Sequence, residues 1–263
     1  MMQPDIFSRT TRRRFRDRAF LGDDDSRWLT RFITTELVDR LSITRRRFDR
    51  VLIIGNDGGD LQRQIMANGS VAFVADPSFR CAARASGVQC DEDRLPFADA
   101  SFDLVLAPSG LDTVNDLPGA LVLIKRILKP DGLFLGAMAG AGGLDTLRKI
   151  ILDTTKPDQI IGRHHPQIDV RAAGDLLTRA GFALPVVESH FITARYPDLF
   201  KLIGDLRANA MTNAMIARQL LRRDQMREMA KQFLALGTPK TEEIFSIIFM
   251  TGWAPSGLAL SAP

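Results

Sequence analysis

The chain has 263 residues, of which 45% are hydrophobic and 25% are charged, a composition typical of a folded globular protein. This length allows one large domain or two small ones with a sizeable core. Two cysteines, Cys81 and Cys90, and three histidines lack the spacing of a disulfide framework or a metal site, so we expect free thiols and no bound metal. No stretch approaches the roughly 20 apolar residues of a membrane-spanning helix. No secretory signal is visible, and we therefore expect a cytoplasmic protein.

The net charge of +4 comes mainly from arginine. Two clusters carry most of it: Arg9, Arg12, Arg13, Arg14, Arg16 and Arg18, and Arg45, Arg46, Arg47 and Arg50. Such clusters either form a solvated face or contact an acidic partner. No aromatic-rich RNA-binding motif accompanies them, so nucleic acid is not the expected partner.

Hydrophobic spacing predicts the first elements of the chain. Residues 28–41 carry apolar side chains at spacings of three and four, which indicates an amphipathic helix. Short apolar runs, rich in branched residues, then predict buried parallel strands at 50–55, 71–75 and 102–107.

Turn and capping residues predict the middle of the chain. Pro118 is typical of the first turn of a helix, where its missing N–H costs little. Residues 129–132 predict a turn before a fourth strand at 133–138. Asp169 predicts the start of a helix that runs through Ala180, because an aspartate side chain can cap a helix N-terminus.

The last part of the chain combines strands with a helical stretch. Residues 186–194 and 243–253 predict two late strands, and residues 199–236 between them are mostly helical. Strands that alternate with helices favour a doubly wound, mainly parallel, Rossmann-like α/β sheet, here with an antiparallel edge strand. We divide the chain into an N-terminal arm and helix (1–45), a core (46–198), a helical insertion over the carboxyl ends of the strands (199–240), a final core strand (241–256) and a tail (257–263).

Glycine and acidic residues at the strand ends indicate a nucleoside ligand. The glycines of the loop from Gly55 to Gly59 let a ligand approach the backbone, and Asp76, about twenty residues later, can accept hydrogen bonds from both hydroxyls of a ribose. An acid in 90–97 can accept a hydrogen bond from an adenine amino group. The alternatives are a tight turn without a ligand and a solvated acidic turn. We expect the ligand to be held by Gly55, Asn56, Asp57, Gly59, Asp76, Pro77, Asp91, Glu92 and Ser109.

Three further motifs carry a family resemblance. The LPF segment at 95–97, SFDLV at 101–105 and LKPDG at 128–132, in this order, resemble the class I S-adenosylmethionine (SAM)-dependent methyltransferases. The resemblance implies a seven-stranded Rossmann-like sheet and SAM as the cofactor.

Four other segments resemble one subfamily: DIFSR at 5–9, VNDLP at 114–118, LGAM at 135–138 and MTGW at 250–253. They are similar to the methyltransferase-like assembly factors of respiratory complex I, which are related to the malonyl carrier-protein methyltransferase of biotin synthesis. The resemblance implies a SAM-dependent methyltransferase that acts on a protein substrate in complex I assembly. The alternatives are an arginine hydroxylase of a complex I subunit, like the mitochondrial member, and a non-enzymatic assembly factor.

The sequence departs from the family pattern at three places. Ile53 replaces an acid of the first strand, Asp57 replaces the middle glycine of the loop, and Asp112-Thr113 replace a His-Trp pair. Ile53 and Asp57 predict weak SAM binding.

Candidate residues for the acceptor side of the reaction follow from position in the chain. Asp112, in the loop after the third strand, is the candidate catalytic residue. The candidates for substrate binding are Arg195, Tyr196, Asn209 and Asn213, the last two one turn apart on a predicted helix face. We expect the insertion and the arginine-rich arm to form the surface that faces a partner.

Overall fold

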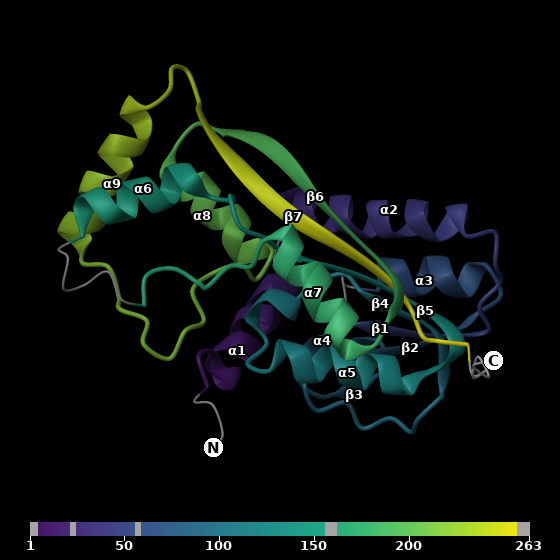
Figure 1. Cartoon of the computed structure of the whole chain (residues 1–263). Helices are drawn as coiled ribbons and strands as arrows, with labels where there is room; N and C mark the ends of the chain where they lie inside the picture. Colours follow the sequence, from purple (N-terminus) through teal and green to yellow (C-terminus); the bar gives the residue numbers. More distant parts are fainter. Residues whose placement is uncertain (1–4, 22–24, 56–58, 156–161, 257–263) are drawn as a thin grey trace.

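The chain forms a seven-stranded mixed sheet in the computed structural model, which describes residues 5–21, 25–55, 59–155 and 162–256 (Figure 1). The strands are β1 (Arg50–Ile54), β2 (Val71–Asp76), β3 (Val88–Gln89), β4 (Phe102–Ala107), β5 (Leu128–Ala139), β6 (Ala183–Tyr196) and β7 (Thr241–Trp253). Their order across the sheet is β3-β2-β1-β4-β5-β7-β6. Strands β1 to β5 pair in parallel, and β7 runs antiparallel to its neighbours β5 and β6. The predicted Rossmann-like fold is confirmed.

Helices cover both faces of this sheet (Figure 1). The helices are α1 (Arg9–Phe20), α2 (Trp28–Ile43), α3 (Asp60–Ala67), α4 (Phe79–Arg84), α5 (Leu117–Ile127), α6 (Asp145–Thr154), α7 (Val170–Ala180), α8 (Leu199–Ala208) and α9 (Arg223–Ala235), with short 3-10 turns at Asp25–Arg27 and Leu111–Thr113. Leu37 of α2 and Ile65 of α3 pack in the core on one face. Ile124 of α5 and Leu177 of α7 pack in the core on the other. None of the helices in the described ranges is long and apolar enough to cross a membrane.

Local capping signals fix several of these helices. The side chain of Asp169 accepts a hydrogen bond from the backbone N–H of Ala172, and Gly181, with φ +84°, ends the same helix. Helix α5 begins with Pro118 in its first turn and Asp116 as its cap. The predictions for both helices are confirmed.

The residues of the predicted turn at 129–132 lie within β5, which begins at Leu128, and Asp131 has the positive φ, +61°, of a turn. The pairing of β4 with β5 is irregular here: Phe102 lies opposite Leu128, and Leu104 lies opposite Leu133. The residues between do not form a free loop, since Asp131 donates its N–H to the carbonyl of Ala254, just beyond β7. A neighbouring segment that is distant in sequence therefore extends the strand through the turn residues.

The stretch at 199–236 consists of two helices, α8 and α9, separated by residues 209–222. The prediction that Asn209 and Asn213 share a helix face is wrong. Asn209 is the C-cap of α8, and Asn213 lies beyond the helix. The side chain of Asn209 is held by hydrogen bonds to the start of α2, which favours the end of α8 at this position.

The two cysteines form no disulfide; Cys81 is buried and Cys90 is half-buried. Burial raises the pKa of Cys81 to about 11 and the pKa of Cys90 to about 12. Both side chains are therefore protonated at neutral pH, and they behave as apolar groups.

Candidate cofactor and acceptor site

The carboxyl ends of β1, β2 and β4 bring Gly55, Asp76 and Ser109 together. Gly55 has φ +84°, and a Cβ there would lie 2.5 Å from the carbonyl oxygen of Ser109. Glycine is therefore required for two reasons, the backbone angle and the close approach. Gly59 also has positive φ, +102°. Asn56 and Asp57, which the sequence places in this loop, lie outside the described residues.

Asp76 ends β2 and is completely buried, with 0% of its surface exposed. Its Oδ1 accepts hydrogen bonds from the N–H of Ser78 at 2.7 Å and from Nε of Arg16 at 3.0 Å. Its Oδ2 accepts from Nη2 of Arg16 at 2.7 Å. Both carboxylate oxygens are therefore engaged by one guanidinium of α1, the bidentate geometry that gives a strong charged pair. Pro77, next to Asp76, accepts a hydrogen bond at its carbonyl from Gln89.

Arg16 is itself almost fully buried, with 8% of its surface exposed. Its Nη1 donates to the hydroxyl of Ser109 at 3.3 Å. Burial alone would lower the pKa of Arg16, but the charge and the hydrogen bonds of Asp76 raise it above its ordinary value. The guanidinium therefore keeps its proton in the interior of the protein.

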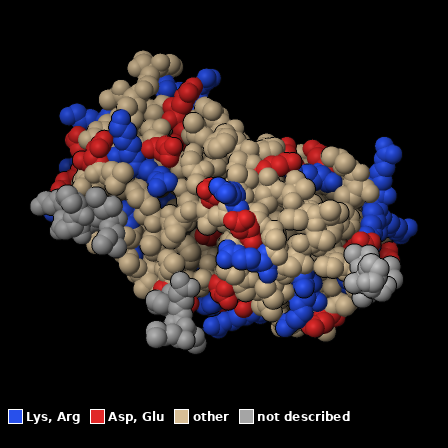
Figure 2. Space-filling model, in the orientation of Figure 1, with Lys and Arg blue, Asp and Glu red and all other residues tan. Residues whose placement is uncertain are grey.

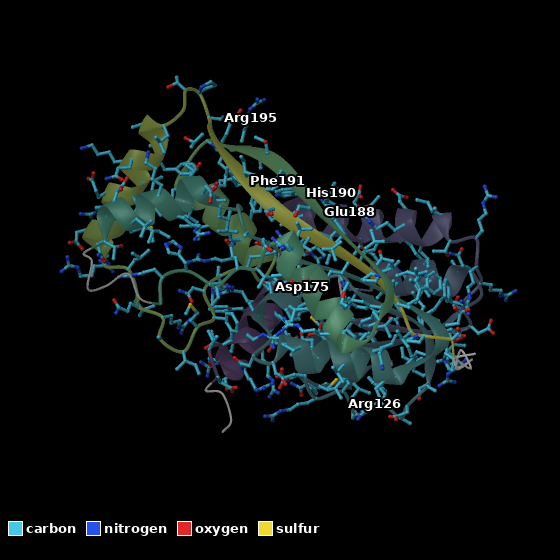
Figure 3. All side chains as sticks on the ribbon, viewed as in Figure 1. Arg126, Asp175, Glu188, His190, Phe191 and Arg195 are labelled. Atoms are coloured by element: carbon cyan, nitrogen blue, oxygen red, sulfur yellow. The ribbon has the colours of Figure 1, made fainter. Side chains whose placement is uncertain are left out.

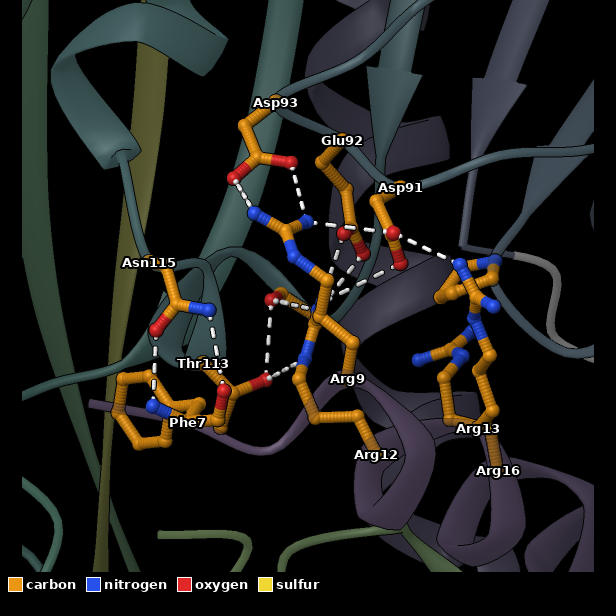
Figure 4. Close-up of polar contacts among 12 residues, drawn as sticks. Phe7, Arg9, Arg12, Arg13, Arg16, Asp91, Glu92, Asp93, Thr113 and Asn115 are labelled. Carbon is orange, nitrogen blue, oxygen red and sulfur yellow. Dashed lines mark hydrogen bonds and ion pairs between the residues drawn. The ribbon is translucent and has the colours of Figure 1, made fainter. Parts of the chain in front are cut away.

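A second buried pair joins α1 to the segment after β3 (Figure 4). Nη2 of Arg12 lies 3.0 Å from each carboxylate oxygen of Glu92 and 3.0 Å from the carbonyl of Gly110. Its Nε donates to the hydroxyl of Thr113 at 3.0 Å. Glu92 is 0% exposed and Arg12 is 4% exposed. Burial raises the pKa of Glu92 above its ordinary value, although the charge of Arg12 opposes this shift.

Two further arginines of α1 bind the neighbouring acids (Figure 4). Nη1 and Nη2 of Arg9 donate to the two carboxylate oxygens of Asp93, both at 2.7 Å. Nη2 of Arg13 donates to Oδ2 of Asp91 at 2.8 Å. Although burial raises the pKa of Asp93, the hydrogen bond and charge of Arg9 bring it below its ordinary value. Oδ1 of Asp91 is buried and accepts no hydrogen bond from any residue within the described ranges.

The expectation that this arginine arm faces a partner is wrong for Arg12 and Arg16. Both are buried against acids of the same chain. The cluster folds as helix α1, whose arginine face packs on Asp76 at the end of β2 and on Glu92 after β3. Over the face of the molecule seen in Figure 2, basic and acidic side chains are interspersed.

A cavity of about 50 Å³ lies between α1, the beginning of α2 and the ends of β4 and β5. Arg12, Arg16, Ser109, Asp112 and Met138 are among its lining residues. Sites for small-molecule ligands usually enclose roughly 300–1,000 Å³. The space that the described residues enclose is therefore small for a nucleoside, because the arginine side chains fill part of it.

A larger cavity of about 200 Å³ lies beside the first, against α6 and α8. Its apolar lining is Leu144, Leu147, Ile151, Ile203, Leu206 and Met211. Its polar lining is Asp112, Arg148, Arg163, His164, His165 and Asn213, among others. Asp112, Ala139 and Met211 border both cavities. A group in the larger cavity would therefore lie next to the strand ends.

The two histidines of the larger cavity favour their neutral forms. Nε2 of His165 accepts a hydrogen bond from the backbone N–H of Ala214 at 2.9 Å. Burial lowers the pKa of His165, against the charge of Asp112. Burial and the nearby charge of Arg148 lower the pKa of His164, whose Nε2 is buried with no hydrogen-bond partner among the described residues.

The four predicted substrate residues do not come together. Arg195 lies near the end of the edge strand β6 and donates to Glu242 at 2.8 Å (Figure 3). Tyr196 is buried and donates its hydroxyl to Asp205 at 3.2 Å. These residues line a shallow depression with Trp28, away from both cavities at the strand ends.

Asn209 and Asn213 do reach the cavities, Asn209 the smaller one and Asn213 the larger. Both amides are already bonded within the chain. Asn209 accepts from the N–H and hydroxyl of Thr30 at 3.0 and 2.8 Å, and Asn213 donates to the carbonyl of Gly162 at 2.6 Å. These bonds position the segment after α8 over the strand ends.

Comparison with known proteins places this architecture in a family. A model of the methyltransferase domain matches residues 52–136. The arginine-hydroxylase NDUFAF5, mitochondrial, of Danio rerio is 30% identical over 266 residues, covering 95% of this chain and 83% of that protein. The chain belongs to the NDUFAF5 family. A malonyl-[acyl-carrier protein] O-methyltransferase of Methylovorus sp. (strain MP688) is 31% identical over 175 residues, covering 65% of this chain and 58% of that protein.

The solved structures agree on the fold of this NDUFAF5-family chain. The BH2331 protein of Bacillus halodurans superimposes with a TM-score of 0.60 at 15% identity, covering 84% of this chain and the whole of that one. The methyltransferase fold implies SAM as the ligand of the strand ends. The residue types fit it: a buried acid ends β2, a second acid, Asp91, has a buried oxygen that accepts no hydrogen bond within the described residues, and Gly55 and Gly59 have positive φ angles.

Two sets of residues were not predicted from the sequence. Arg9, Arg12, Arg13 and Arg16 follow the i, i+3, i+4, i+7 spacing of one helix face, after Ser8 as a cap, so a helix signal was present. Arg148, Arg163, His164 and His165 had no such signal, because their relation to Asp112 exists only in the folded chain.

Proposed function

We propose that this protein is a SAM-dependent methyltransferase that acts on a protein subunit during the assembly of a respiratory complex I-like enzyme. The observation that carries the proposal is the larger cavity beside the strand ends, which shares Asp112, Ala139 and Met211 with the smaller, cofactor-side cavity. Two adjoining spaces of this kind suit the methyl end of a donor and an acceptor group. The family relationship to NDUFAF5 supports a protein of an assembly pathway as the acceptor.

The strand ends would hold the cofactor. Asp76 would accept the hydrogen bonds of the ribose hydroxyls, and Oδ1 of Asp91 would accept one from the adenine amino group. Gly55 and Gly59 have positive φ angles, which glycine adopts more readily than other residues. When bound, SAM supplies an electrophilic methyl group. The residues of this chain supply orientation and a place for the proton of the acceptor.

Asp112 is the residue that we assign to that proton. It borders both cavities, so an acceptor atom in the larger one can reach the donor and the carboxylate together. Nε2 of His165 accepts a hydrogen bond from the backbone N–H of Ala214. In the neutral ring the proton is therefore on Nδ1, and Nε2 has no lone pair left to act as a base. Asp112 remains the carboxylate that faces the acceptor space.

The charge of the larger cavity supports one of the candidate reactions. Arg148 and Arg163 line it, and Asp112 is the single carboxylate among its described lining residues. Two guanidinium groups oppose the entry of an arginine side chain, because like charges repel in a space with little water. The cavity therefore favours methylation of a neutral or acidic group over hydroxylation of an arginine.

The test uses the purified chain, SAM with a labelled methyl group, and complex I subunits as acceptors. We expect label transfer and a mass gain of one CH₂ unit on one subunit. Asp112→Asn should reduce the transfer, whereas Asp99→Asn, an exposed acid paired with Arg126, should not. Release of the label by alkali would identify an ester of an acidic group. A gain of one oxygen atom would show the hydroxylase instead, and binding of a subunit without any mass change would show a non-enzymatic factor.

A further inference from the structure

The arginines of helix α1 contact the acids that we propose for binding the ribose and adenine of the cofactor. Arg9, Arg12, Arg13 and Arg16 lie on one face of the helix. The acids that they bind are Asp93, Glu92, Asp91 and Asp76, respectively. The acid at the end of β2 and the acids after β3 are therefore paired within the chain before any ligand arrives.

The pair of Arg16 with Asp76 is incompatible with a bound ribose. A ribose diol needs the same two carboxylate oxygens that Nε and Nη2 of Arg16 occupy at 3.0 and 2.7 Å. The guanidinium also lies against Gly55: a Cβ built on that glycine would be 3.4 Å from Nη2 of Arg16. The guanidinium of Arg16 thus lies between Gly55 and Asp76, where the ribose would be placed.

We propose that the arginine face of α1 is a latch on the cofactor site: SAM binds only when Arg16 leaves Asp76. This inference rests on the proposed function, because it takes SAM as the ligand of the strand ends. The latch makes cofactor binding and the closed position of Arg16 mutually exclusive. The affinity for SAM then depends on the strength of the Arg16–Asp76 pair.

The construction of α1 allows such an exchange. The chain before the helix is fixed, since Asn115 binds the backbone of Ile6 and Phe7, and the N–H of Ser8 donates to the carbonyl of Ala214. Release of Arg16 therefore does not require the N-terminal segment to detach. Buried ion pairs are near balance between attraction and the cost of desolvation, so ligand hydroxyls that satisfy Asp76 can replace the guanidinium.

The experiment measures the binding of S-adenosylhomocysteine to the full chain by calorimetry. Arg16→Ala removes the guanidinium from Asp76, and Arg14→Ala is the matched control, because Arg14 is an exposed arginine of the same helix. A charged hydrogen bond to Asp76 must be broken before the ribose can bind in the parent chain, so we expect Arg16→Ala to tighten binding by at least about tenfold. Arg14→Ala should bind like the parent chain.

Two further variants keep the outcome decisive. Arg16→Lys retains the charge but not the bidentate contact with Asp76, so it should tighten binding less than Arg16→Ala. It takes the place of Arg16→Ala if circular dichroism shows that Arg16→Ala is unfolded. Arg16→Ala combined with Asp76→Asn should bind more weakly than Arg16→Ala, because Asp76 is the proposed acceptor of the ribose hydroxyls. Parent-like or weaker binding by Arg16→Ala, while the parent binds, overturns the latch and leaves the methyltransferase proposal standing. Absence of binding in every folded variant overturns the cofactor proposal together with the latch.

Discussion

The pair of Arg12 with Glu92 gives a quantitative test of how α1 is held. Arg12→Met removes a guanidinium that makes contacts of 3.0 Å with both oxygens of Glu92, with the carbonyl of Gly110 and with the hydroxyl of Thr113. The methionine keeps much of the apolar stem of the side chain. The change therefore isolates the charge and its hydrogen bonds.

The expected loss of stability follows from burial. Glu92 is 0% exposed, so its carboxylate has no water to replace the lost partner. Breaking a buried pair by removing one member costs about 3–5 kcal/mol. Burial already raises the pKa of Glu92, and the variant can reduce the cost by protonating it. We therefore expect about 3 kcal/mol, near the lower limit of that range.

Urea unfolding at neutral pH measures this loss. Arg126→Met is the control, because the Arg126–Asp99 pair is exposed, with 44% and 73% of the side chains accessible, and such pairs contribute about 0–1 kcal/mol. Arg12→Met combined with Glu92→Leu should recover much of the stability, since no charge then remains unpaired. Because Glu92 of Arg12→Met has a raised pKa in the folded state, the deficit should grow as the pH rises. A loss for Arg12→Met no larger than that of Arg126→Met would refute the buried-pair argument.

Two more substitutions test the strand-end geometry and a buried acid. Gly55→Ala should destabilise the fold by about 2 kcal/mol or more in thermal unfolding, because the alanine would have a positive φ and its Cβ would clash with Ser109. Gly204→Ala is the control: this residue lies in α8 with open space around it, so the change should stabilise the fold by about 0.4–1 kcal/mol. Burial raises the pKa of Glu243 in the folded state above its ordinary value of 4.5. The stabilisation that protonated Glu243 gives to the fold is therefore complete below pH 4.5 and is lost as the pH rises. Unfolding at several pH values should show the parent chain losing stability relative to Glu243→Gln as the pH rises, and a gain would contradict the assignment.

The sheet was predictable because its signals are local. Strand β4 is a mostly apolar run interrupted by Asp103, and α7 has Asp169 at its start and Gly181 at its end. Such signals need no knowledge of neighbours in space. The start of β5 at Leu128 was not predictable for the opposite reason: the strand character of 129–132 depends on pairing with Ala254, which is more than 100 residues away.

The site was predictable only in part. Gly55, Asp76 and Asp91 stand where the alternation of strands and loops indicated, at the carboxyl ends of parallel strands. Their partners were not predicted, because a cluster of arginines has the same pattern whether it is solvated or paired. The choice depends on Asp76, which is 60 positions from Arg16 in the sequence.

The sequence departure at Ile53 and the latch affect different parts of the same site. Ile53 is fully buried in β1, with Val74 and Leu106 as its neighbours in the parallel ladders, so the position has become part of the core. A side-chain movement cannot bring an acid back there. Arg16, in contrast, can leave Asp76 without any change in the core. The weak cofactor binding expected from Ile53 and Asp57 stays a prediction. The proposed latch would add a reversible contribution from α1, and a partner that displaces α1 would relieve that contribution alone.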